Sequence, residues 1–119
     1  MREPLTWTKK LRLRRWVLRE LAREHAELVR VADDQAQRTE FTRHAARASA
    51  LVRIFEVTGR ARDEIAFLVL EHPIEPSAWD AAYQAMRVEV EQKLASLGLP
   101  VRTAARPPIE VRRSASPRV

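Results

Sequence analysis

Two consecutive segments repeat apolar residues with the period of an α-helix, and their relative phase most constrains the fold. At about 100° per residue, residues 8–33 and residues 37–57 each collect apolar side chains on one side of a helix. In one unbroken helix the second stripe would be displaced by about half a turn, and the two apolar faces would point in opposite directions. A break between them lets both faces be buried together, which predicts an antiparallel helical hairpin. The first stripe contains Trp7, Leu11, Val17, Leu18, Leu21, Leu28, Val29 and Ala32, and the second contains Phe41, Ala45, Ala48, Leu51, Val52 and Phe55.

The residues between the two stripes favour the break. Asp33 and Asp34 can accept hydrogen bonds from backbone N–H groups at the start of the second helix. Gly59 stands where a left-handed residue is expected at the end of that helix. Neither glycine nor proline separates the stripes, so a continuous helix is the alternative, and in it Trp16 would join the second stripe.

A third helix is predicted after Gly59. The stretch "ARDEIAFLVLEH" is apolar nearly all round from Ile65 to Leu70, which predicts a short buried helix over residues 61–71. The linker "HPIEP" follows it.

A fourth helix is predicted over residues 78–97. Ser77 and Asp80 resemble a capping arrangement, and Gly98 followed by Pro100 marks the end. Its apolar stripe contains Trp79, Tyr83, Met86, Val90, Leu94 and Leu97.

Composition places these helices in one small domain. A chain of 119 residues suits one core, and only two glycines argue against an all-β protein. We therefore expect an all-α fold: a small bundle of about four helices built on the antiparallel hairpin. It would comprise an N-terminal arm at 1–8, one helical domain at 9–98 and an extended, basic, Arg/Pro-rich tail at 99–119.

The sequence also excludes several classes. Cysteine is absent, which rules out disulfides and thiolate metal sites and favours the cytoplasm. No apolar run approaches the roughly 20 residues of a membrane span, and no signal-peptide core is present. We expect a soluble, unprocessed cytoplasmic protein that does not act at a membrane.

Positive charge is concentrated at the two ends. Residues 1–19 hold seven Lys or Arg against one Glu, and residues 102–119 hold five Arg against one Glu. Because the whole chain has a net charge of +6, residues 20–101 carry −4. Basic ends around a mildly acidic body are typical of proteins that touch nucleic acid or another polyanion, although charged ends also confer solubility.

Catalytic patterns are lacking. His25 is predicted to be a hydrogen-bonded interface histidine, and Glu40 with His44 is predicted to be an ordinary surface pair rather than a metal site. Glu20, Glu24 and Glu27 share one face of the first helix, in the pattern of a solvated surface. There is no phosphate loop, zinc-binding helix motif or nucleophile elbow, so we expect no enzyme activity, metal or cofactor.

The strongest pattern is a basic ridge beside a tryptophan. On the helical wheel Trp16 lies among cations, whereas Arg14 and His25 intrude on the apolar stripe. Trp16 could pack on the fourth helix or a partner subunit, stack on a base of single-stranded nucleic acid, or enter an anionic membrane interface. The predicted nucleic-acid contacts are Lys9, Lys10, Arg12, Arg15, Trp16, Arg19 and Arg23, with Arg106, Arg112 and Arg113 in the tail.

A small helical chain with basic ends resembles several classes of protein. These are the helical small subunits of CRISPR effector ribonucleoproteins, phage virion or packaging components, and plasmid accessory proteins. The leading hypothesis is a non-catalytic subunit of a nucleoprotein assembly that contacts RNA or DNA backbone without reading sequence. The alternative is a structural or adaptor protein that assembles through helix faces and tail docking without nucleic acid, with a homo-oligomer as one form.

Overall fold

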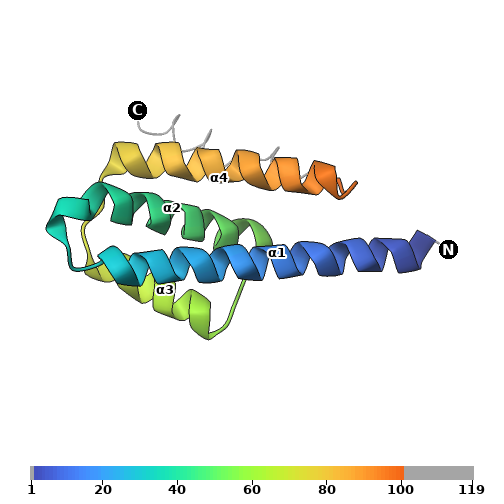
Figure 1. The fold of residues 1–119 in the computed structure, drawn as a ribbon, viewed down its shortest axis with the longest axis horizontal. Helices are drawn as coiled ribbons and strands as arrows, with labels where there is room; N and C mark the ends of the chain where they lie inside the picture. The colour runs from blue at the N-terminus through green and yellow to red at the C-terminus, as the bar shows by residue number, and fades with distance from the viewer. Residues whose placement is uncertain (1, 101–119) are drawn as a thin grey trace, which may run out of the picture.

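The structure is a computed structural model that describes residues 2–100, with side chains described from residue 7 onward. Within that range the chain forms four α-helices, one 3₁₀ turn and no strand, which confirms the small all-α bundle (Figure 1). The predicted tail, apart from its first two residues, lies outside the described range. The elements are α1 (Arg2–Val31), the turn η1 (Gln35–Gln37), α2 (Arg38–Phe55), α3 (Arg60–Glu71) and α4 (Pro76–Ser96). Because α1 begins at Arg2, residues 2–8 of the predicted arm are its first turns.

The hairpin prediction is confirmed: α1 and α2 run antiparallel and pack together (Figure 1). The Asp34 N–H donates to the Val31 carbonyl at 3.2 Å, and an Asp34 carboxylate oxygen accepts from the Ala36 N–H at 3.0 Å. Asp34 thus ends α1 and caps η1, as the sequence indicates. A continuous helix through this region is excluded.

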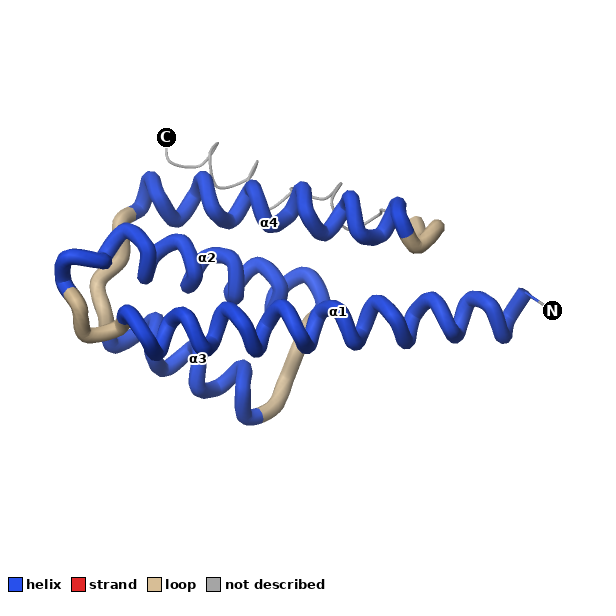
Figure 2. Tube along the Cα trace, viewed as in Figure 1, coloured by secondary structure: helices blue, strands red, loops and turns tan. Residues whose placement is uncertain are grey.

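α2 is the central helix. It contacts α1, α3 and α4, and it lies between α1 and α4 in the view of Figure 2, where short loops join the helices. A helix surrounded in this way must be buried on several sides, and small side chains let its neighbours approach closely. Its buried residues are Phe41, Thr42, Ala45, Ala46, Ala48, Ala50 and Leu51.

The buried face of α1 differs from the predicted stripe. Val17, Leu21 and Leu28 are buried as predicted, whereas Trp7, Leu18 and Val29 are exposed. The buried side is rotated by about 60° from the predicted one, because α2 packs against the side that carries Val17, Leu21, Glu24, Leu28 and Val31. An apolar strip of α1 therefore stays open to solvent.

The end of α2 also differs from the prediction. Glu56, and not Gly59, adopts the left-handed conformation, with φ 52° and ψ 46°. The Val57 N–H then donates to the Val52 carbonyl at 3.0 Å, which closes the helix end. Gly59 has φ 111° and is the N-cap of α3, so α2 ends three residues before the predicted cap.

The prediction was correct for the C-terminal end of α4 and wrong for its start. Gly98, with φ 73°, ends the helix as predicted: Leu99 N–H donates to the Leu94 carbonyl at 2.8 Å. The start was predicted wrongly, because Glu75 is the N-cap and Pro76 opens the first turn, which puts Ser77 inside the helix. Glu75 is held by α2, where the Thr42 hydroxyl accepts its N–H at 3.0 Å.

α3 is less buried than the sequence suggests. Only Ile65 of this helix is buried, while Phe67 is 62% exposed and Leu70 is 84% exposed. The helix packs on α1 and α2 by one side alone. The prediction of a buried helix was therefore wrong, and α3 presents an apolar outer surface.

Candidate nucleic-acid interface

The predicted ridge lies on α1, the helix whose N-terminal end extends beyond the others in Figure 1. Arg12, Arg15, Arg19 and Arg23 are all exposed. Steps of three or four residues put them on one side of the helix, opposite the buried Val17 side, over a length of about 16 Å. The structure thus displays this part of the predicted site as one continuous cationic row.

Most cations of this segment lack a carboxylate partner within the described range. Arg12, Arg14, Arg15, Arg19 and Lys10 form no ion pair among residues 7–100. Their charges are therefore available to an outside anion. Five arginines elsewhere in the bundle already bind carboxylates: Arg30 with Glu27, Arg43 with Glu40, Arg47 with Glu24 and Glu89, Arg60 with Glu64, and Arg62 with Asp63.

Two predicted cations have structural partners. Arg23 pairs with Glu20 one turn earlier on the same helix. Lys9 is partly buried, and its Nζ lies 3.1 Å from the position that a Cβ on Gly98 would occupy. Its ammonium is thus placed at the C-terminal end of α4, where the helix dipole favours a positive charge. These two side chains help to hold the fold as well as adding to the basic surface.

Trp16 packs inside the molecule. The ring is partly buried against the hydrophobic core, and Lys93 Nζ of α4 lies 5.7 Å from its centroid. This is the arrangement that packing on the fourth helix predicts, with an added cation–π contact. A base that stacked on this face of the ring would have to displace Lys93.

The sequence prediction missed Trp7 and Arg14 as exposed groups beside the ridge. Trp7 is 65% exposed, and Arg14, two turns later on the same side of α1, is also exposed. The spacing of seven residues was visible in the sequence, but the indole was assigned to the core stripe because it shares the apolar side of the helical wheel. The predicted contacts Arg106, Arg112 and Arg113 lie outside the described residues.

Away from the ridge, a buried polar cluster joins three helices. Glu24 of α1 is 3% exposed, so the predicted solvated carboxylate is in fact buried. Its Oε1 lies 2.6 Å from Nδ1 of His44, and its Oε2 accepts from Nε of Arg47 at 2.9 Å. Arg47 also donates to both oxygens of Glu89 on α4, at 2.8 and 3.0 Å.

Ion pairing in this cluster fixes its charges. The Glu89 and Glu24 carboxylates raise the pKa of Arg47, with the Glu89 hydrogen bonds as the largest cause. The same hydrogen bonds lower the pKa of Glu89 below its ordinary value. His44 lies 3.8 Å from Glu40, the predicted pair, but its short contact is with Glu24. Each group faces a protein partner, so the cluster stabilises the bundle rather than presenting reactive groups.

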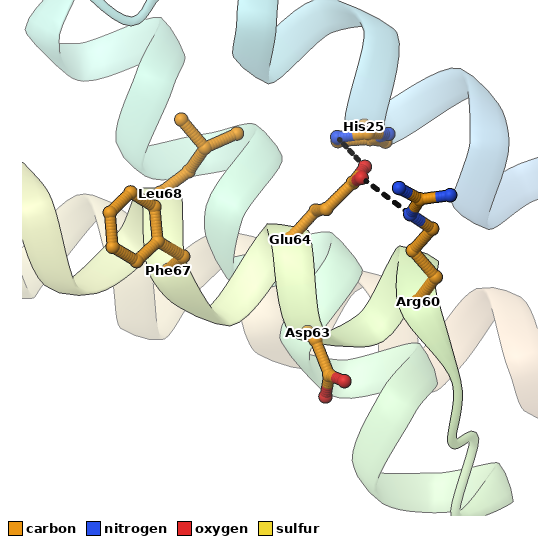
Figure 3. Close-up of a pocket in the computed structure, with 6 residues that line it drawn as sticks. All are labelled: His25, Arg60, Asp63, Glu64, Phe67 and Leu68. Atoms are coloured by element: carbon orange, nitrogen blue, oxygen red, sulfur yellow. Dashed lines mark ion pairs between the residues drawn. The ribbon is translucent and has the colours of Figure 1, made fainter.

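A shallow hollow of about 410 Å³ lies between α1 and α3 (Figure 3). His25 Nε2 and Arg60 Nε each lie 3.4 Å from a carboxylate oxygen of Glu64, which confirms His25 as an interface histidine. Phe67 and Leu68 line the rest of the hollow beside Asp63. Among the described residues no group of three or more His, Asp or Glu side chains is arranged to hold a metal ion.

None of the helices within residues 2–100 combines the length and apolar character that crossing a membrane requires. A scan against models of protein families, a search of curated proteins and a search of solved structures each found no match for the chain.

Proposed function

We propose that this protein is a non-catalytic subunit of a nucleoprotein assembly that binds RNA or DNA backbone through the exposed cations of α1. One observation carries the proposal: Arg12, Arg15 and Arg19 form an exposed row without carboxylate partners among the described residues. Arginines of the bundle body are mostly neutralised by carboxylates one turn away or on another helix. Selective placement of unpaired cations on one helix favours binding of an extended polyanion over general solubility.

The chemistry of the row suits phosphate. A guanidinium group presents a planar set of donors that matches two phosphate oxygens, and it stays charged at any physiological pH. The row presents charge and no hydrogen-bond acceptor that could distinguish one base edge from another, apart from Glu20 beside Arg23. Contact with the backbone positions a strand without reading its sequence.

The salt dependence of binding tests this function. Full-length protein is titrated into fluorescently labelled single-stranded RNA and DNA at several salt concentrations. If three arginines neutralise three phosphates, the slope of log K against log salt is about −2 or more negative. Replacing Arg12, Arg15 and Arg19 together by Ala reduces that slope and weakens binding to a similar degree for strands of different sequence.

A charge-matched control separates the row from net charge. Replacing Arg43, Arg60 and Arg62 by Ala removes the same three charges from arginines that bind carboxylates. We expect this variant to bind nearly as well as the unchanged protein. Equal losses in both triple variants would show that overall charge, and not the row, attracts the strand. Absence of salt-sensitive binding to any strand would refute the proposed function.

The outer surface of α3 favours a second function, assembly with a protein. Phe67 and Leu70 are 62% and 84% exposed, and Ile74 in the following linker is 38% exposed. Neighbouring apolar side chains on one small helix are typical of a protein contact. Within a nucleoprotein assembly α3 would contact another subunit while α1 contacts the strand; without nucleic acid the same surface would serve an adaptor.

Replacing Phe67 and Leu70 by Ser distinguishes these functions. Since both side chains lie outside the core, the variant should fold and keep its salt-dependent binding to a single strand. Light scattering then reports any self-association that the change removes. Loss of strand binding in this variant, with the fold intact, would contradict the separation of the two surfaces.

A further inference from the structure

Trp7 is placed differently from the other two tryptophans of the chain. It is 65% exposed, whereas Trp16 and Trp79 are partly buried and pack against the hydrophobic core. It lies in the second turn of α1, and the N-terminal end of this helix extends beyond α2 and α4 in Figure 1. An indole in this position presents a large aromatic surface that the described part of the fold does not use.

Unpaired cations lie next to this indole. Lys10 is three residues and Arg14 seven residues after Trp7, so both lie on its side of the helix, within about 11 Å along the axis. Both are exposed and form no ion pair within the described range. An aromatic ring flanked by free cations is the combination that binds single-stranded nucleic acid: bases stack on the ring while the cations follow the backbone.

We propose that Trp7 stacks on an unpaired base while Lys10 and Arg14 contact the adjoining phosphates, so that the site prefers single strands to duplexes. This rests on the proposed function. In a duplex the faces of each base are covered by its neighbours, and Trp7 could stack only after a base was unstacked. The arginine row on the neighbouring side of α1 binds backbone in either form.

The arrangement fits nucleic acid better than a lipid surface. An interfacial helix needs a continuous apolar face that enters the bilayer. Trp7 and Leu18 are the large apolar side chains exposed in the described N-terminal half of α1, and they lie about 16 Å apart along the axis. Arg14 lies between them on the same side and interrupts the apolar strip.

Fluorescence of Trp7 provides the first test. The protein with Trp16→Phe and Trp79→Phe has Trp7 as its sole tryptophan, and circular dichroism checks that it folds. It is titrated with a 15-nucleotide deoxythymidine strand (about one binding-site length) and with an abasic strand of equal length. Stacking predicts quenching by the thymidine strand and little quenching by the abasic strand. Equal quenching by both would overturn the proposal.

Affinity provides the second test, in the otherwise unchanged protein. Trp7→Ala should weaken binding of the thymidine strand roughly 5- to 100-fold, and leave binding of the abasic strand and of duplex DNA unchanged. Trp7→Phe should retain most of the affinity, since phenylalanine keeps a stacking face. Leu18→Ala is the matched control, because it removes an exposed apolar side chain from the same side of α1, and it should bind normally.

The outcomes separate this inference from the proposed function. Normal binding by Trp7→Ala, with binding lost in the Arg12, Arg15 and Arg19 triple variant, overturns the stacking role and leaves the backbone function intact. Absence of salt-dependent binding in the unchanged protein overturns both. A blue shift of Trp7 on phosphatidylserine vesicles without binding to any strand would overturn the proposal in favour of a lipid surface.

Discussion

At the scale of single residues, Glu24 carries the polar contacts that join α1 to α2. Its carboxylate is 3% exposed and binds both His44 and Arg47. Glu24→Gln keeps the shape but removes the charge that both partners face, so we expect unfolding to require about 2–3 kcal/mol less free energy. Urea unfolding measures this as a lower midpoint at an unchanged slope. Glu40→Gln, at a half-exposed carboxylate, is the control and should change little; equal effects would contradict the special role of Glu24.

The pKa of Glu89 gives a second prediction at this scale. Arg47 lowers this pKa below the ordinary value of 4.5, so the pair stabilises the fold above pH 4.5 and the contribution is lost as the pH falls through the lower folded-state pKa. Glu89→Gln should therefore be less stable than the unchanged protein at neutral pH. The difference should shrink as the pH falls below 4.5 and should vanish below the folded-state pKa of Glu89. Because the Glu89 side chain is 42% exposed, solvent screening keeps it below about 1 kcal/mol. A difference that stayed constant between these pH values would contradict the pairing.

The burial of Glu24 could not be predicted from the sequence. Its spacing with Glu20 and Glu27 predicts a solvated surface, and only the approach of α2, with His44 and Arg47, explains a buried carboxylate. The exposed arginine row was predictable, because charged residues at helical spacing rarely find buried partners. The exposure of Trp7 was not, because it depends on how far α2 and α4 reach along α1.

At the scale of elements, the end of α2 carries backbone strain at Glu56. This residue has φ 52°, a left-handed conformation that costs a residue with a Cβ roughly 1 kcal/mol. Glu56→Gly should therefore raise the free energy of unfolding by about 0.5–1 kcal/mol, although glycine usually destabilises a helix. Gly59→Ala is the opposite test and should lower the free energy of unfolding. The φ angle there is 111° and no atom lies within 4 Å of the added Cβ, so the loss would come from backbone strain alone. Thermal unfolding of both variants checks the pair, and a destabilising Glu56→Gly would contradict the assignment.

The positions of the elements were more predictable than their faces. All four predicted helices are present, and apart from the start of α1, six residues earlier than predicted, their bounds lie close to the predicted ranges, because periodicity and the Asp34 and Gly98 signals are local. Which side of α1 is buried depends on where α2 packs against it, so Leu18 and Val29 were assigned to the core and are exposed. The exposed side of α3 has the same origin, since its nearly uniform apolar sequence contains no periodic signal of which side packs.

At the scale of the whole molecule, the bundle depends on small residues in its central helix. Ala46 is fully buried on α2, which α1, α3 and α4 surround. Ala46→Leu adds three carbons where the neighbouring helices leave no exposed surface, so it should cost about 1–3 kcal/mol of stability by forcing helices apart. Ala26→Leu, on the exposed side of α1, makes the same chemical change without crowding and should be nearly neutral. Urea unfolding compares the two variants.

Equal stability of the two variants would mean that α2 is less closely surrounded than the fold shows. A selective loss in Ala46→Leu, with strand binding retained while the protein is folded, would locate stability in the packing around α2 and binding on the exposed cations of α1.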